Sequence, residues 1–482
     1  MATTLQGNSQ TMSTFTVLRH LFLAISFGIF GYYYYNNYLN IERQRVNNVL
    51  HGLLLEERSV NLSTEKAVAV GFGACVDLFV DGIPLVNALG LKPPKEAKYH
   101  NNIQSLEDVA EMFAFFLSNG AAAERYVSNE LLSVMVEKAA QLEGAYLAMG
   151  GNAPVISKRF AIEGFTVHVG AKGSEKMRKQ VHKNIHFSQG FGENDDIHLI
   201  LEYKVGEQWG PYVVNRANRF ILHSDKNNPE LRSLESFMEV VEKVQPQTVL
   251  IGGLQMLDNF KFEEGVREER MNKMRDWLRG LPASIKIHFE MASFGEVAMM
   301  KSLIENIVPY VDSLGMNEQE LPNIESMIRD GTIIEVADSN PRTATVLDNL
   351  RSLIQNVELV SQRGLSRVHV HTLAYQAIWT KKGSMWKNTR AGCAKASLVA
   401  HRHVCGVKEI NADNAKLLMD DSFSLTTKNT DKRISFNEHA PISCWEEREN
   451  EICIAPVLVC TKVKQTAGGG DNITPAGLMP QL

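Results

Sequence analysis

Three glycines followed by an acid lie near the end of the chain, in the run Ala467-Gly468-Gly469-Gly470-Asp471-Asn472. The run follows an apolar, strand-like segment and precedes a short helical one. The glycines permit a tight turn whose backbone N–H groups converge on an anion, and a helix N-terminus adds its positive end. Asp471 would then take a proton from an attacking hydroxyl while the turn holds phosphoryl charge. A glycine hairpin with an N-capping aspartate is the alternative, and the motif alone does not separate the two.

Three oxygen-donor side chains follow two other apolar segments. Glu290 comes directly after the run Ile285–Phe289, and Asn317 and Glu320 are three residues apart, which places them on one face of a helical turn. Oxygen donors at strand ends suit Mg²⁺ that is held largely through water. Taken alone, the segment Asn317–Glu320 is more typical of a capped, acidic helix start.

Two glycine-containing segments, 71–77 and 150–153, lie at the ends of strand-like runs. Glycines there let a polyol approach the backbone, and Asp77 would accept hydrogen bonds from two hydroxyls. Val76 occupies the third glycine position of a dinucleotide fingerprint, and the chain has no Walker A sequence. Any nucleotide phosphates must therefore be bound in another way.

A histidine- and cysteine-containing segment, His401 to Cys405, together with Cys393, raises the question of a metal site. Its spacing fits no common zinc pattern. We expect these residues to belong to the packing face of a cationic helix instead.

Apolar runs that alternate with helical patterns must position these residues. The strand-like runs are 67–72, 76–80, 145–149, 248–251, 285–289, 332–336, 368–371 and 454–459, and the helical windows between them include 106–117, 230–244, 263–278 and 345–363. Continuous apolar strands separated by helices predict a doubly wound α/β fold, in which a mostly parallel sheet carries helices on both faces.

One region, from about 155 to 212, departs from this pattern. It alternates apolar and polar residues and is rich in Gly, Asn and Asp. Such a pattern is typical of antiparallel hairpins. We therefore expect a small β-sheet lid, formed roughly by residues 78–100 and 155–212.

The composition of the 482 residues, 44% hydrophobic and 22% charged with a net charge of −5, is that of a globular protein. No basic block is present, so nucleic acid is not expected as a partner. The apolar and tyrosine-rich run Leu21–Tyr35 is not followed by a small-residue cleavage site. We expect residues 1–45 to form an uncleaved signal anchor and linker that binds a membrane, with one catalytic domain over 46–482; a buried helix is the alternative.

An anchor of this kind would place the domain in an oxidising lumen, where disulfides form. Five of the six cysteines lie in the last quarter of the chain. Asn61-Leu-Ser63 is then a usable glycosylation sequon, whereas the sequon at Asn472 lies in the glycine-rich turn and should stay unmodified.

Taken together, the motifs resemble the ADP-dependent glucokinases of the ribokinase superfamily, in the form found in animals. The resemblance covers about 67–478, through GFGACVDLFVDG, GGNA, RANRF, HFEMASF, SLGMNEQEL, RVHVHTLAY and TAGGGDN. It implies a ribokinase-like fold with a small β lid, an endoplasmic-reticulum anchor, glucose and ADP as substrates, and a monomer. It also implies a disulfide between Cys405 and Cys460.

The resemblance implies a role for individual residues as well. Asp471 resembles the catalytic base, and Gly468, Gly469 and Gly470 the anion hole. Asp77, Gly150, Gly151 and Asn152 match sugar-binding positions, to which Glu124 and Gln255 are added as weaker candidates. Arg219 matches an arginine that meets the ADP phosphates, His369 or His371 is expected near the adenine, and Glu290, Asn317 and Glu320 match residues that position Mg²⁺.

Three alternatives remain open at this stage. An ATP-dependent sugar kinase and an ADP-dependent phosphofructokinase of the same fold would use the same motifs, and only the resemblance favours ADP and glucose. A membrane-tethered pseudokinase would be expected to lack the base or the metal-binding residues, and all of these are present.

Overall fold

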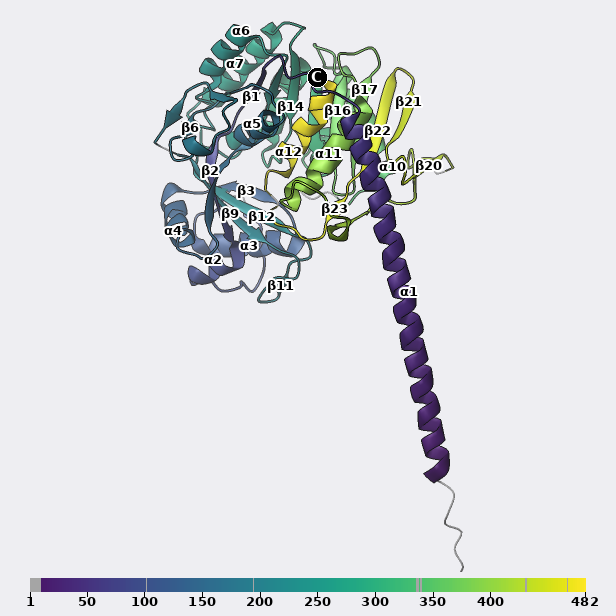
Figure 1. The fold of residues 1–482 in the computed structure, drawn as a ribbon. Coiled ribbons are helices and arrows are strands. Elements are labelled where there is room, and N and C mark those ends of the chain that lie inside the picture. The colour runs from purple at the N-terminus through teal and green to yellow at the C-terminus, as the bar shows by residue number, and fades with distance from the viewer. Residues whose placement is uncertain are drawn as a thin grey trace, which may run out of the picture.

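The chain folds into a large α/β domain and a smaller sheet domain, from which one long helix projects (Figure 1). The computed structural model describes residues 10–100, 102–193, 195–334, 338, 340–429, 431–465 and 467–482.

The large domain is built on a ten-stranded sheet. In sheet order its strands are β21 (Ser443–Glu447), β22 (Asn450–Pro456), β17 (Tyr375–Lys381), β16 (Arg367–His371), β15 (Ser313–Asn317), β14 (Lys286–Glu290), β13 (Thr248–Ile251), β1 (Val68–Gly71), β5 (Val167–Val169) and β7 (Ile185–Phe187). The strands are parallel from β16 to β7 and antiparallel from β16 to β21. From β1 the chain adds strands first on one side and then, from β13, on the other, so the sheet has a switch point between β1 and β13.

Helices cover both faces of this sheet, as the sequence predicts. Val249 and Ile251 point to one face, against α6 (Leu234–Val244), α7 (Val266–Gly280), α8 (Val297–Asn306), α9 (Glu320–Asp330) and α10 (Thr343–Glu358). Leu250 points to the opposite face, in a core that includes α5 (Asn152–Ile162) and the end of α12 (Gly469–Leu478). α11 (Thr389–Val404) lies beside α12 and packs against β17 and β22. Every residue of β13 is buried, because parallel strands are covered on both sides.

The smaller domain is a five-stranded sheet with its own core. Its strand order is β3 (Ala123–Tyr126), β12 (Asn218–His223), β9 (Ile197–Tyr203), β2 (Cys75–Asp81) and β4 (Tyr146–Gly150). Leu78, Leu199 and Phe220 point to one face and pack with α2 (Gly82–Ala88), α3 (Leu106–Asn119) and α4 (Asn129–Ala139). Asp77, which alternates with Leu78 along β2, lies on the other face.

The limits predicted for the lid, 78–100 and 155–212, differ from this domain. β3, β4 and β12 lie outside those limits, whereas α5, β5 and β7 lie inside them and belong to the large domain. The apolar and polar residues of β5 alternate because Val167 and Val169 are buried while His168 stacks on His186. The strand is parallel to β1 and β7, so this alternation does not mark a hairpin.

Short strand pairs complete the fold, and one predicted strand is missing. The pairs are β6 (Gly173–Ser174) with β8 (Phe191–Gly192), β10 (Gln208–Trp209) with β11 (Tyr212–Val213), β18 (Ala415–Lys416) with β23 (Val459–Cys460), and β19 (Ser422–Ser424) with β20 (Arg433–Ser435). The strand predicted at 332–336 does not form over 332–334, and residues 335 and 336 lie outside the described part of the chain.

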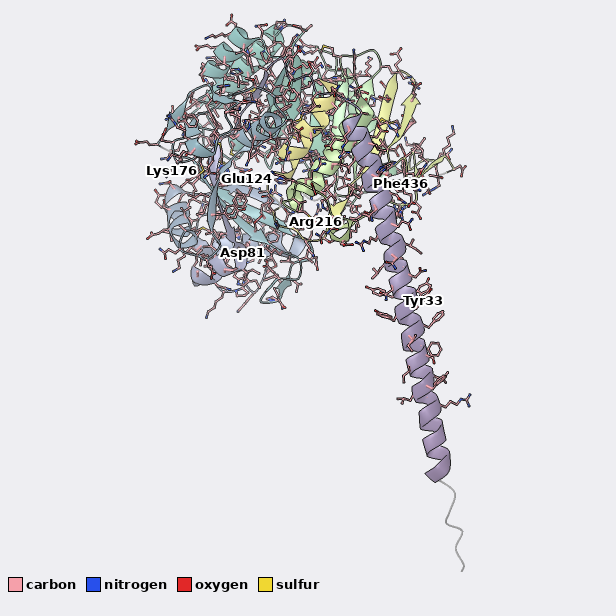
Figure 2. All side chains as sticks on the ribbon, viewed as in Figure 1. Tyr33, Asp81, Glu124, Lys176, Arg216 and Phe436 are labelled. Carbon is pink, nitrogen blue, oxygen red and sulfur yellow. A yellow bond between two sulfur atoms is a disulfide. The ribbon has the colours of Figure 1, made fainter. Side chains whose placement is uncertain are left out.

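The long helix α1 (Gln10–Arg58) is exposed over much of its length and docked at its C-terminal end. Val49 and Leu53 are buried in a core shared with α11, and Arg402 of α11 pairs with Glu57 at 2.8 Å. Large apolar and aromatic side chains between Leu21 and Ile41 point away from the rest of the molecule (Figure 2, where Tyr33 is labelled). Within the described residues, no helix combines the length and the apolarity that crossing a membrane requires.

Two disulfides tie the C-terminal region together. The bond between Cys405 and Cys460 confirms the expected pairing and links the end of α11 to β23. A second bond, Cys444 to Cys453, which the sequence does not predict, joins β21 to β22.

Candidate active site

The glycine-rich turn at residues 467–471, called the anion turn below, begins helix α12. Gly468 has a left-handed φ of 69° and caps the helix, so Asp471 stands in its first turn. The first intrahelical bond runs from the Asn472 N–H to the Gly468 carbonyl, which leaves the preceding N–H groups without helical partners. At Gly470 a Cβ would lie only 3.2 Å from Cε1 of His371, so a side chain would crowd the site. The turn therefore presents backbone donors at the positive end of a helix.

Asp471 is held by a chain of amide side chains from two other elements. Asn152, the first residue of α5, donates from Nδ2 to Asp471 Oδ1 at 2.8 Å. Gln255, in a short 3₁₀ helix after β13, donates from Nε2 to the side-chain oxygen Oδ1 of Asn152 at 2.8 Å. Burial raises the pKa of Asp471 to about 6, and the charge of Glu290 acts in the same direction. A carboxylate with this pKa is suited to general base catalysis near neutral pH.

Glycines let the second predicted acid, Asp77, lie against the backbone of β4. A Cβ on Gly150 would fall 1.9 Å from Asp77 Oδ1, so only glycine leaves room for the carboxylate. Gly151 has a φ of 83°, and a Cβ there would meet the Gly73 carbonyl oxygen at 2.3 Å. Burial raises the pKa of Asp77 to about 6.

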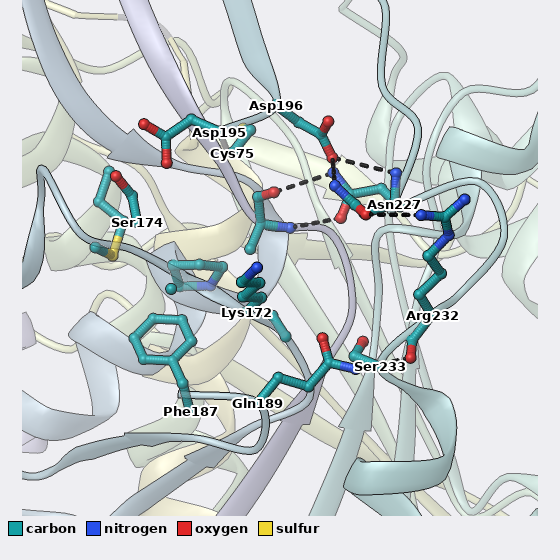
Figure 3. Close-up of a pocket in the computed structure, with 16 residues that line it drawn as sticks. Cys75, Lys172, Ser174, Phe187, Gln189, Asp195, Asp196, Asn227, Arg232 and Ser233 are labelled. Atoms are coloured by element: carbon teal, nitrogen blue, oxygen red, sulfur yellow. Dashed lines mark hydrogen bonds between the residues drawn. The ribbon is translucent and has the colours of Figure 1, made fainter. Parts of the chain in front are cut away.

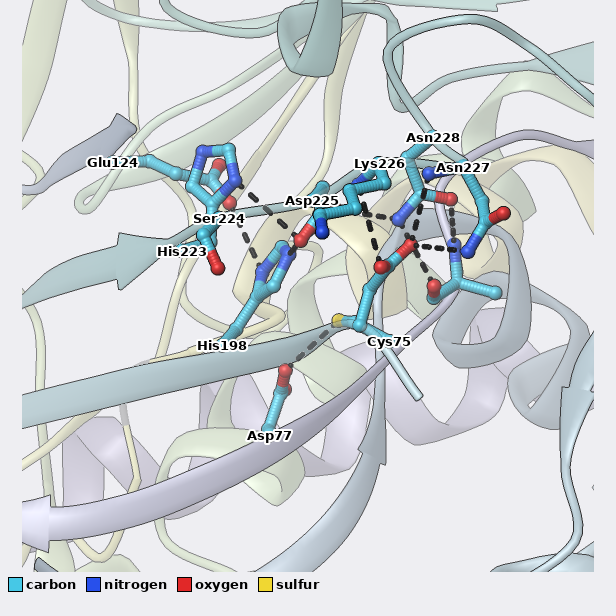
Figure 4. A network of polar contacts seen from close by, with 12 residues as sticks. Cys75, Asp77, Glu124, His198, His223, Ser224, Asp225, Lys226, Asn227 and Asn228 are labelled. Carbon is cyan, nitrogen blue, oxygen red and sulfur yellow. Dashed lines mark hydrogen bonds and ion pairs between the residues drawn. The ribbon is translucent and has the colours of Figure 1, made fainter. Parts of the chain in front are cut away.

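A buried polar network extends from Glu124 through two histidines (Figure 4). His198 contacts Glu124 through Nδ1 at 3.2 Å and Asp225 through Nε2 at 2.9 Å, and His223 lies 3.5 Å from Asp225. Burial opposes charge on His198, but Asp225 outweighs it and holds the pKa of His198 well above its ordinary value. Asn228 joins Asp225 to the Ala74 backbone, which fixes the network to the connection between β1 and β2.

These acids act on one another electrostatically, so the elements that carry them lie near one another at one site. The charge of Glu124 raises the pKa values of Asp77 and Asp471, and the charge of Arg219 lowers that of Asp471. Arg219 comes from β12 of the small sheet, whereas Asp471 comes from the large domain. The structure thus brings the predicted base, sugar-binding acids and phosphate-binding arginine to the same place.

The predicted metal-binding residues lie beside the anion turn. Glu290 accepts hydrogen bonds from Thr474 at 2.8 Å and from His371 at 3.1 Å, and a Cβ on Gly470 would lie 3.7 Å from its Oε1. Burial opposes its ionisation, but His288 and His371 lower the pKa of Glu290 to about 2.

Asn317 and Glu320 form a closed pair at the end of β15. The Asn317 amide donates to Glu320 Oε1 at 2.9 Å, and the Glu320 N–H donates to Asn317 Oδ1 at 2.9 Å. Burial, together with the charges of Glu290 and Glu318, raises the pKa of Glu320 to about 7. This excess of negative charge fits a cation, and because the oxygens already accept hydrogen bonds, Mg²⁺ would be held mainly through water.

The two histidines predicted near an adenine occupy different positions. His371 contacts Glu290 and Gly470, at the anion turn. His369 is fully buried beneath the C-terminal end of α12, where a Cβ on Gly477 would lie 2.8 Å from its ring, and it bonds Gln376 at 2.9 Å. Its ring has no exposed face, so this structure offers no contact between His369 and a nucleotide.

Two cavities lie in this part of the molecule. One is beside the start of β2, and none of the predicted site residues lines it (Figure 3). The other is lined by Glu124 and Gln255 together with Tyr126 and His223. The second cavity therefore adjoins the predicted sugar-binding side.

Several residues of the site carry no signal in the sequence. His198 and His223 lie in the strand pair of β9 and β12, and Asp225 follows β12; only the tertiary structure brings them to Glu124. Two further histidines bind backbone instead of metal, since His401 contacts the Leu458 carbonyl and His403 the Ala467 carbonyl. With Cys405 in a disulfide, the segment 401–405 does not form a metal site, as expected.

This fold, with an acid at a glycine-rich helix start beside a sheet switch point, defines a kinase of the ribokinase-like class. Architecture of this type is found in ADP-dependent kinases. A solved ADP-dependent kinase in complex with fructose 6-phosphate and ADPβS aligns with a TM-score of 0.62 and 20% identity, over 91% of this chain and 97% of that one. A phosphofructokinase from Pyrococcus horikoshii with AMP aligns with a TM-score of 0.60 and 17% identity, over 87% and 98% of the two chains.

The chain belongs to the ADP-specific phosphofructokinase/glucokinase family, whose conserved region matches residues 66–480. The ADP-dependent glucokinase of Bos taurus is 32% identical over 86% of this chain and 84% of its own length. A probable ADP-dependent glucokinase of Caenorhabditis elegans is 31% identical over 96% of this chain and 94% of its own length.

Replacing Asp225 by Asn should destabilise the fold by about 3–5 kcal/mol, because two buried histidines lose the carboxylate that both contact. Burial alone would raise the pKa of Asp225, but His198 and His223 hold it far below the ordinary value. The loss of stability in this variant should therefore have its full size above about pH 5 and should shrink as the pH falls below about 4. Urea unfolding at several pH values measures it. Asp81→Asn, which breaks an exposed pair with Lys204 in the same domain, should cost less than about 1 kcal/mol; equal losses would contradict the assignment.

Proposed function

We propose that this chain is an ADP-dependent glucokinase, which transfers the β-phosphoryl group of ADP to the 6-hydroxyl of D-glucose and releases glucose 6-phosphate and AMP. The observation that carries the proposal is Asp471, a buried carboxylate with a pKa near 6 at the start of a glycine-rich helix. Family membership and the names of the animal relatives support ADP and glucose as the substrates.

Asp471 would accept the proton of the 6-hydroxyl as that oxygen attacks the phosphorus atom. The new O–P bond forms as the bond from phosphorus to the AMP oxygen breaks, and AMP leaves with the bridging oxygen. The Asn152 amide holds one Asp471 oxygen, and the other, which accepts no hydrogen bond from the described residues, would face the sugar. The N–H groups of the anion turn stabilise the charge on the transferred group.

The acids on the sugar side favour an uncharged sugar over a sugar phosphate. Glu124 keeps a lowered pKa because His198 and His223 offset its burial, and Asp225 stays ionised beside it. Carboxylates in a buried site would repel a phosphate dianion, while their oxygens accept hydrogen bonds from hydroxyls. We therefore favour glucose over fructose 6-phosphate.

On the donor side, Arg219 reaches toward Asp471 from the small sheet and would bind the ADP phosphates. Glu290, Asn317 and Glu320 would hold Mg²⁺. The metal ion, when bound, neutralises phosphate charge. His371, between Glu290 and Gly470, would keep the carboxylate ionised and in place.

We also propose that the protein is monomeric and is held at an endoplasmic-reticulum membrane by α1. The exposed apolar and aromatic residues between Leu21 and Ile41 would lie in lipid or at its surface. Two disulfides are typical of an oxidising compartment, and Asn61 of the sequon is exposed.

Residues 42–482, which keep the docked end of α1, should form glucose 6-phosphate from glucose and ADP in the presence of Mg²⁺, and not from ATP. Asp471→Asn keeps the shape of the side chain and should lower kcat at least ~10²-fold, because the general base is lost. Direct detection of glucose 6-phosphate and AMP checks both. Turnover with ATP alone, or with fructose 6-phosphate in place of glucose, would assign another kinase of this fold. A folded protein that binds ADP without turnover would indicate a pseudokinase.

The rate should depend on pH through the same carboxylate. Because burial raises the pKa of Asp471 to about 6, protonation removes the base as pH falls, and kcat/KM should decline about tenfold per unit below about pH 6. Asp77 has a similar pKa, so Asp77→Asn serves as the control: the acidic limb should remain in that variant. A rate that stays constant down to pH 5 would contradict Asp471 as the base.

Full-length protein made in animal cells should sediment with microsomal membranes and stay there in high salt, whereas residues 42–482 behind a cleavable secretion signal should be soluble. Asn61→Gln should migrate faster in a gel if the domain is lumenal, because one glycan is lost. Full-length protein in the soluble fraction would contradict the anchor, and an unchanged mobility would contradict glycosylation at Asn61.

A further inference from the structure

Helix α5 runs beside the first turn of α12 and contacts it through one face. Asn152, Val155 and Arg159 recur at intervals of three and four residues, so they share that face. Asn152 holds Asp471, and the Val155 side chain lies 3.3 Å from the position of a Cβ on Gly468. Arg159 donates from Nε to Asn472 Oδ1 at 3.1 Å. The face of α5 that carries Asn152, Val155 and Arg159 therefore lies along the anion turn.

Arg159 is a half-buried cation without a carboxylate partner. Within the described residues it makes no ion pair, and Glu163, one turn further along α5, pairs instead with Lys395 at 3.0 Å. Its only hydrogen bond among the described residues uses Nε and leaves the terminal guanidinium nitrogens available. Burial lowers the pKa of Arg159, and the charges of Glu163 and Glu57 offset this only in part.

Positive charge gathers at this side of the turn from both domains. His403, whose ring binds the Ala467 carbonyl at 2.7 Å, feels the charges of Arg159 and Arg219, and burial with these charges lowers its pKa to about 4. His403 is therefore neutral at pH 7 and adds no charge of its own. Arg219 approaches from the small sheet and Arg159 from the large domain. Cations beside backbone N–H groups that have no helical partner are the arrangement that binds phosphate.

We propose that Arg159 is a further phosphate-binding residue for the nucleotide donor, acting at the anion turn from the large domain while Arg219 acts from the small one. The inference rests on the proposed function, since it assigns a contact within that donor site. A guanidinium suits this role because it offers a planar set of donors to phosphate oxygens.

Titration calorimetry of ADP with residues 42–482 tests the proposal without requiring turnover. Arg159→Met should weaken ADP binding about 10- to 100-fold, the usual worth of a hydrogen bond from a charged group, and Arg159→Lys should restore part of it. Glucose binding, followed separately, should not change. Lys158→Met removes the neighbouring exposed cation and should change ADP binding less than about threefold, because an exposed charge is screened.

The Asn472→Ala variant distinguishes a direct contact between Arg159 and ADP from an indirect role in which Arg159 only supports the turn. If Arg159 only supported the turn through Asn472, the Asn472→Ala and Arg159→Met variants would weaken ADP binding equally, which would overturn the proposal. Unchanged ADP binding in Arg159→Met, or an equal loss in Lys158→Met, would also overturn it. These outcomes leave the proposed function unaffected. A wild-type protein that binds ADP but does not phosphorylate glucose would instead contradict the proposed function, and the Arg159 contact would stand.

Discussion

The hydrogen bond from Asn152 to Asp471 is the contact on which the candidate site depends. It joins residues 319 positions apart in sequence, at the starts of two helices that lie side by side. Asn152 follows directly after Gly151, whose left-handed backbone allows β4 of the small sheet to turn into α5 of the large domain. The same short segment therefore fixes the orientation of the base and the connection between the domains. A side chain at Gly150 or Gly151 would disturb both at once.

Three carboxylates at the site have different pKa values because their neighbours differ. Glu290 is surrounded by hydrogen-bond donors, and its pKa falls to about 2. Asp471 accepts a hydrogen bond from the Asn152 amide, and burial raises its pKa to about 6. Glu320, buried near two other acids, has its pKa raised to about 7. Desolvation acts on all three, and the number of donors and nearby charges decides the outcome. One cleft can thereby hold a permanent anion beside a base that exchanges protons near neutral pH.

The small sheet contributes charge, and the large domain contributes the anion turn. Arg219 and the Glu124–His198–Asp225 network stand on the sheet face that is not covered by its own helices. Asn228 fixes this network to the backbone of Ala74, next to the switch point of the large sheet. Because the acids and the arginine are held on a rigid sheet, they keep fixed positions relative to one another.

The sequence by itself determined the fold class and the position of the glycine-rich helix start. Apolar runs such as 248–251 predict β13 residue for residue, because a strand buried on both faces must be apolar throughout. The glycines before Asp471 permit an anion-binding helix start, and the left-handed backbone at Gly468 is a local requirement that favours glycine there. The disulfide between Cys405 and Cys460 was expected from family resemblance, and the structure contains it.

Only the tertiary structure decided which residues meet. His198 comes from β9, Glu124 from β3 and Asp225 from the segment after β12, and no spacing in the chain places them together. The limits of the small domain could not be read either, since β5 alternates like a hairpin strand but pairs in parallel with β1. Arg159 is indistinguishable in sequence from any surface arginine until α5 lies against α12. Backbone geometry depends on neighbouring residues, so the sequence indicates it. Charge compensation depends on contacts between residues far apart in the chain, so it appears only in the folded protein.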